Sequence, residues 1–204
     1  MVKIKNVVFD IGRVLIDYRW EDYLSELHFP YDIEKRLGKV IFQSKIWSER
    51  DRGLYTEEEY IQQFIQSAPE LEKEILRVLS TINQAMKPFS FATEWIRSIK
   101  MQGLKVYLLS NYPKNMFEDA LQNYEFFQYV DGMVISYEAH QIKPEPEIYN
   151  TLIERYHLIP EETIFLDDVK KNTNQAEGLG FHTICVTSHQ AAVDGLKKYG
   201  IISE

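Results

Sequence analysis

The sequence has one cysteine, no long apolar run and fewer basic than acidic residues. Cys185 alone excludes a disulfide within the chain and is compatible with a reducing compartment. No segment approaches the ~20 apolar residues of a membrane span. The first apolar run is too short for a signal peptide and is interrupted by Asp10. We therefore expect a cytoplasmic protein that does not act on membranes.

The formal net charge of -8 argues against a nucleic-acid partner, because phosphate backbones attract clustered Lys and Arg side chains. A phosphorylated substrate would need positive charge supplied locally, against the overall field. The 204 residues, 45% of them hydrophobic, suffice for one domain of roughly 150 residues and a sizeable insertion. The oligomeric state is left open.

Short apolar runs alternate with stretches of helical periodicity over most of the chain. The runs predict strands at residues 6–10, 105–110, 132–136, 163–167 and 182–187. Apolar residues spaced three and four apart predict helices at residues 92–101, 116–123, 147–156 and 172–179. This alternation predicts an α/β fold, with a Rossmann-like parallel sheet and helices on both of its faces.

Residues 17–86 contain no convincing strand run and interrupt this alternation just after the first strand. Helices are predicted at residues 56–66 and 70–83, and Thr56 with Glu59 has the form of a capping box. We therefore predict a helical module at 17–86, inserted into a core made of residues 1–16 and 87–204.

Polar residues follow the predicted strands where the strands end, and Lys143 lies soon after the third one. They are Asp10, Ser110, Asn111, Asp167 and Asp168. The carboxyl ends of parallel strands meet at one edge of the sheet, where ligands bind. Gathered carboxylates repel one another unless a cation lies between them, and Mg²⁺ prefers such oxygen ligands.

This set of residues suits phosphoryl transfer. The carboxylate of Asp10 could attack phosphorus and form an aspartyl-phosphate. Ser110 and Asn111 could donate hydrogen bonds to the phosphoryl oxygens. Lys143 would place a positive charge beside both the phosphate and Asp10.

Four segments, in order along the chain, resemble the motifs of the haloacid dehalogenase superfamily. They are Phe9-Asp10-Ile11-Gly12-x-Val14, Leu108-Leu109-Ser110-Asn111, Lys143-Pro144, and Phe165-Leu166-Asp167-Asp168 with Asn172. The resemblance implies a helical cap after the first strand and Asp10 as the nucleophile. It also implies that the Gly12 carbonyl and Asp168 bind Mg²⁺, with Asp167 in the outer shell or as an alternative ligand.

Gly12 departs from the family pattern, in which an aspartate two residues after the nucleophile acts as general acid and base. In one interpretation the leaving group needs little protonation, as in the Asp-x-Gly branch resembling sugar-1-phosphate (α-D-glucose-1-phosphate) phosphatases. In a second, Asp17 or a cap residue takes over the role. In a third, hydrolysis is lost and a protein that binds phosphometabolites or acts as a scaffold remains. We favour the first.

The sequence therefore predicts a Mg²⁺-dependent phosphatase for a small phosphorylated metabolite, such as a sugar phosphate. A metal-independent 2-haloacid dehalogenase is the further alternative, since those enzymes also lack the second aspartate. In the predicted cap, Arg52 and Trp47 are candidates for substrate selection, and most other charges of residues 47–53 are expected to be solvated. Asn172 either orients Asp168 or caps the helix that follows.

Overall fold

A five-stranded parallel sheet forms the centre of the molecule in the computed structural model, which describes residues 3–201. The strands lie in the order β5-β4-β1-β6-β7, so the first strand is central. Their bounds are β1 Asn6–Phe9, β4 Lys105–Ser110, β5 Gly132–Ile135, β6 Thr163–Asp167 and β7 His182–Cys185. All five predicted strands are present, with ends that differ by two residues at most.

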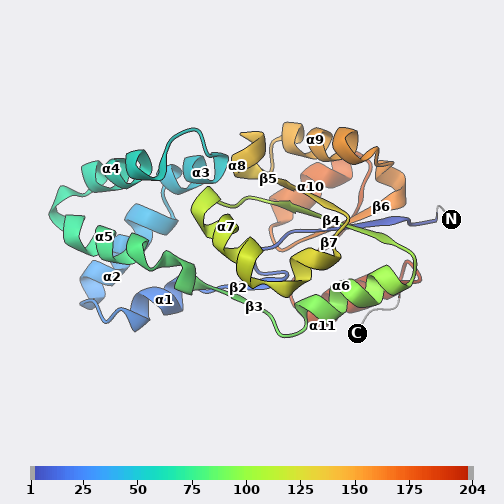
Figure 1. Cartoon of the computed structure of the whole chain (residues 1–204), viewed down its shortest axis with the longest axis horizontal. Helices are drawn as coiled ribbons and strands as arrows, with labels where there is room; N and C mark the ends of the chain where they lie inside the picture. The colour runs from blue at the N-terminus through green and yellow to red at the C-terminus, as the bar shows by residue number, and fades with distance from the viewer. Residues whose placement is uncertain (1–2, 202–204) are drawn as a thin grey trace.

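Alternate residues of the strands face two separate apolar layers, as the pleat of a strand requires. Val7 and Phe9 of β1 pack with helices α6 (Ala92–Met101) and α11 (His189–Lys197), whereas Val8 packs with α9 (Pro146–Tyr156) and α10 (Lys170–Gly178). The two pairs of helices therefore cover opposite faces of the sheet (Figure 1). The predicted α/β class is confirmed.

The segment that contains helices α1 to α5 forms the other half of the elongated molecule in Figure 1. Its helices are α1 Trp20–Glu26, α2 Tyr31–Leu37, α3 Lys45–Arg52, α4 Glu57–Ser67 and α5 Glu72–Ser80. Thr56 and Glu59 form the predicted capping box at the start of α4. None of the described helices is long and apolar enough to cross a membrane.

Two short strands, which the sequence pattern did not reveal, connect this helical region to the core. They are β2 (Ile16–Tyr18) and β3 (Met86–Pro88), paired antiparallel. Three residues are too few to show a recognisable period, so the pairing emerges only from the tertiary structure. The ribbon holds both ends of the helical region together.

The helical region also contacts the core directly, because α3 packs on the short helix α8 (Ser136–Ala139) (Figure 1). Gly53 ends α3 with a left-handed φ of 71°, and a Cβ there would lie 2.9 Å from the backbone of Tyr137. Glycine is required on both counts. The remaining core helix, α7 (Lys114–Asn123), supplies Asn115, whose Oδ1 accepts a 2.9 Å hydrogen bond from Arg50 of α3.

Candidate active site

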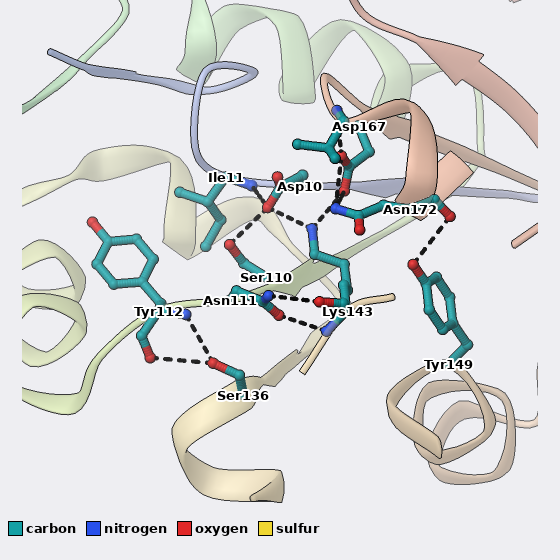
Figure 2. A network of polar contacts seen from close by, with 11 residues as sticks. Asp10, Ile11, Ser110, Asn111, Tyr112, Ser136, Lys143, Tyr149, Asp167 and Asn172 are labelled. Carbon is teal, nitrogen blue, oxygen red and sulfur yellow. Dashed lines mark hydrogen bonds and ion pairs between the residues drawn. The ribbon is translucent and has the colours of Figure 1, made fainter. Parts of the chain in front are cut away.

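Asp10 follows the central strand directly and is held firmly by neighbouring donors. Its Oδ1 accepts hydrogen bonds from the Ile11 amide at 2.7 Å and from the Ser110 hydroxyl at 2.7 Å. The Nζ of Lys143 lies 2.9 Å from the same oxygen (Figure 2). Within residues 3–201, no hydrogen bond reaches Oδ2 of Asp10, so that oxygen is available to a metal ion or a substrate.

Lys143 lies between two carboxylates and is almost completely buried. Its Nζ is 2.6 Å from Oδ2 of Asp167 as well as 2.9 Å from Asp10. Asn111 holds the lysine backbone at both ends, because its Oδ1 accepts from the Lys143 amide at 2.8 Å and its Nδ2 donates to the Lys143 carbonyl at 3.0 Å. The structure therefore brings Asn111 to the site as a support for Lys143 (Figure 2).

The adjacent carboxylates Asp167 and Asp168 have different surroundings. Asp167 is fully buried and accepts hydrogen bonds from Lys143, from the backbone amide of Val169 at 2.8 Å and from the side-chain Nδ2 of Asn172 at 3.0 Å. Asp168 is only partly buried, and no other described residue donates a hydrogen bond to its carboxylate. Asn172 contacts Asp167 and lies inside α10, so neither role predicted for it is correct.

The site concentrates negative charge. Burial raises the pKa of Asp10 to about 7, helped by Asp167 and Asp168 and opposed by Lys143. Burial likewise raises the pKa of Asp168. For Lys143, burial favours the neutral form, but Asp10 and Asp167 outweigh it and keep the pKa of its ammonium group above the ordinary value.

One lysine cannot balance three carboxylates, and their geometry fits a metal ion. Asp10, Asp167 and Asp168 each offer an oxygen, and these oxygens lie within 4.8 Å of one another. Carboxylate oxygens suit a hard divalent cation such as Mg²⁺, and one or two of these three carboxylates could bind it directly together with other oxygens. The three residues can therefore hold a metal ion.

Gly12 lies beside a small cavity between the core and the helical region. The cavity has a volume of about 90 Å³, and its lining includes Gly12, Tyr18, Trp47, Asp51 and Asn111. A Cβ built on Gly12 would meet nothing within 4 Å, and the residue does not have a positive φ. Steric constraints therefore do not require glycine at this position.

Charged side chains at the end of α3 form contacts and line a cavity that the sequence did not indicate. Arg50 is 1% exposed and forms an ion pair with Glu57 at 2.7 Å, so the expectation of a solvated side chain is wrong for it. Arg52 forms a two-pronged ion pair with Glu145, at 2.8 and 2.7 Å. Asp51, which sequence reasoning did not single out, lines the cavity beside Gly12.

Comparison with known proteins places these features in a family. A family model described as haloacid dehalogenase-like hydrolase matches residues 4–171. The chain is 30% identical to D-ribitol-5-phosphate phosphatase of Bacteroides thetaiotaomicron, over 88% of this chain and 90% of that protein. It is 31% identical over 95% of its length to acyl-CoA dehydrogenase family member 10 of Mus musculus, of which it spans only 19%.

Comparison with solved structures supports the same family. A haloacid dehalogenase family enzyme from Bacteroides thetaiotaomicron, in complex with magnesium and inorganic phosphate, matches with a TM-score of 0.70 and 26% identity. The match covers 89% of this chain and 93% of that one. Fold and site together define a hydrolase of the α/β fold class whose helical region corresponds to a cap. The chain belongs to the haloacid dehalogenase-like hydrolases, as its motifs predicted.

Proposed function

We propose that this protein is a Mg²⁺-dependent phosphatase that hydrolyses a small phosphorylated metabolite, such as a sugar phosphate, through an aspartyl-phosphate on Asp10. The observation that carries the proposal is the environment of Asp10. Three donors hold its Oδ1, no described protein donor occupies its Oδ2, and Lys143 and Asp168 lie beside it. A carboxylate oriented in this way is suited to act as a nucleophile.

The donor arrangement supports a proposal for the metal ligands. Asp10, Asp168 and the Gly12 carbonyl would bind Mg²⁺, while Asp167, already engaged by Lys143 and Asn172, would support them from outside. The bound cation would neutralise part of the negative charge that develops on the transferring phosphoryl group.

The residues of the chain then have distinct roles. The Asp10 carboxylate attacks phosphorus, the alcohol leaves, and water hydrolyses the aspartyl-phosphate. Lys143 opposes the protonation of Asp10 and offers its charge to the phosphoryl oxygens. The Ser110 hydroxyl orients Asp10 and is proposed to donate to the phosphate, and Asn111 positions Lys143. A direct contact from Asn111 to the phosphate stays a prediction.

The helical region, residues 17–86, acts in this proposal as a cap that excludes water and limits substrate size. Trp47 lines the cavity beside Gly12, which supports a role in substrate selection. The ion pair between Arg52 and Glu145 favours a role for Arg52 in docking the cap. The similar phosphatase named for D-ribitol-5-phosphate supports a small polyol or sugar phosphate as substrate. The narrower sugar-1-phosphate assignment stays a prediction.

The test is a screen of phosphorylated metabolites for phosphate release, with and without Mg²⁺, using Asp10→Asn as the blank. We expect Mg²⁺-dependent release above that blank for at least one sugar or polyol phosphate. No release from any compound would favour a phosphometabolite-binding or scaffold protein. Halide release from 2-haloacids without metal would favour a dehalogenase.

A further inference from the structure

The space beside Gly12 is open, and position 12 is where the family pattern places the general acid and base. The alcohol oxygen that leaves phosphorus carries negative charge and requires a proton unless it is a very good leaving group. Gly12 has no side chain to supply one, and a side chain there would meet no obstruction. Any acid that serves this position must therefore reach the cavity from another part of the chain.

Asp51 is the carboxylic acid in the lining of that cavity. The other lining residues are Gly12, Ile16, Tyr18, Trp47, Met86, Asn111, Tyr112 and Pro113. Within the described chain, the Asp51 carboxylate forms no ion pair and no side-chain hydrogen bond, whereas its neighbours Arg50 and Arg52 are paired with Glu57 and Glu145. The Asp51 carboxyl group is therefore free to act on a ligand.

Contacts with the core hold the backbone of Asp51 and of the residues after it in place. Its carbonyl accepts a 2.6 Å hydrogen bond from Ser136 of the core, and the next two residues contact the core through Glu145 and Tyr137. Asp17, the other acid suggested by the sequence, is placed differently. Ile16 and Tyr18 line the cavity, so Asp17 between them on β2 points to the opposite face of the strand.

The surroundings of Asp51 also suit proton transfer near neutral pH. Burial raises the pKa of Asp51 to about 7, and Asp10 adds to the effect while Arg50 and Lys143 oppose it. Tyr18 and Tyr112, the other titratable groups in the cavity lining, stay neutral because burial raises the pKa of both, and Asp51 raises that of Tyr18 further. A carboxyl group with such a pKa can both give and take a proton at physiological pH.

Building on the phosphatase function, we infer that Asp51 is the general acid and base, contributed by the cap in place of a residue at position 12. In the first step the P–O bond to the alcohol breaks as Asp10 bonds to phosphorus, and the Asp51 carboxyl proton passes to the leaving oxygen. In the second step the Asp51 carboxylate removes a proton from water. The water oxygen bonds to phosphorus, and the bond from phosphorus to Asp10 breaks.

The discriminating experiment compares leaving groups. Asp51→Asn keeps the shape of the side chain but cannot donate a proton as a carboxylic acid. We expect its hydrolysis of alkyl phosphates such as ribitol-5-phosphate to fall by about 10²–10⁴-fold. With p-nitrophenyl phosphate, the pre-steady-state burst of nitrophenol should stay within a few fold of wild type, because that leaving group needs no proton. Asp17→Asn is the matched control and should leave both rates nearly unchanged.

The outcomes separate this inference from the function on which it rests. Equal losses of alkyl turnover and aryl burst in Asp51→Asn would overturn the role of Asp51, as would unchanged alkyl turnover. A selective loss in Asp17→Asn instead would also overturn it. If wild type releases no more phosphate than Asp10→Asn from these two substrates or from any other compound of the screen, the phosphatase function itself is wrong.

Discussion

Arg52 of the cap and Glu145 of the core form a two-pronged ion pair, with N–O distances of 2.8 and 2.7 Å. Glu145 lies two residues after Lys143, so the pair connects the cap to the loop that carries Lys143. Glu145 raises the pKa of the Arg52 guanidinium further, and Arg52 lowers the pKa of the Glu145 carboxyl. Each partner thus stabilises the charged form of the other across the contact between cap and core.

We expect Glu145→Gln to loosen the cap without unfolding the protein. Both side chains are partly exposed, so the loss should be about 0.2–1 kcal/mol and should shrink at high salt. Hydrogen exchange of the α3 backbone amides measures this loss and should become faster in the variant. Glu49→Gln is the control, since Glu49 touches the same arginine from within α3. Equal exchange rates in both variants would contradict the docking role.

Gly53→Ala should destabilise the contact between cap and core more severely. A left-handed φ costs a non-glycine residue about 1–2 kcal/mol, and the new Cβ would also press on the Tyr137 backbone. Thermal unfolding should show a lower midpoint, and the affinity for substrate should fall. Gly103→Ala, which has a similar φ but no atom near its Cβ, isolates the cost of the backbone conformation. Equal midpoints for the two variants would show that the contact with Tyr137 has no effect.

Asp168→Asn and Asp167→Asn should differ in their effect on Mg²⁺ binding. Loss of an outer-shell carboxylate weakens metal binding by about 10–100-fold, which we expect for Asp167→Asn. Asp168→Asn should weaken it further, because Asp168 is the proposed direct ligand. Calorimetric titration with Mg²⁺ measures both, and chelation of the metal should abolish phosphate release by the wild type. The reverse order would make Asp167 the direct ligand.

His189 should make the folded state sensitive to acid. Its ring stacks on Phe91 with centroids 3.8 Å apart, its Nε2 is buried without a hydrogen-bond partner, and burial lowers its pKa. The unfolded chain binds a proton near pH 6.5 more readily than the folded one, so stability should fall as pH drops below that value.

His189→Phe keeps the stacked ring and cannot be protonated. Urea unfolding at pH 8, 6.5 and 5.5 measures the free energy of unfolding of both proteins. As pH falls, the free energy of unfolding should decrease less for the variant than for the wild type. A difference that stays constant over this range would exclude His189 as the cause.

Local patterns predicted the elements that carry a strong periodic or capping signal. The three central strands β1, β4 and β6 are buried on both faces over nearly their whole length, so they form apolar runs, and the Thr56–Glu59 box marks the start of α4. The ribbon β2–β3 was missed because each strand has three residues and its pairing spans about seventy positions of the chain. The contacts of Asn172 were missed because they depend on how α10 packs beside β6.

The sequence by itself determined the fold class, the family and the convergence of Asp10, Ser110, Lys143 and Asp167-Asp168, because parallel strands bring their carboxyl ends to one edge. It could also show that Gly12 lacks a carboxylate. Only the tertiary structure decided what lies opposite that glycine. Asp51 reaches the cavity because α3 docks on α8 and Gly53 allows close approach to Tyr137, and such contacts between distant segments leave no periodic signal in the sequence.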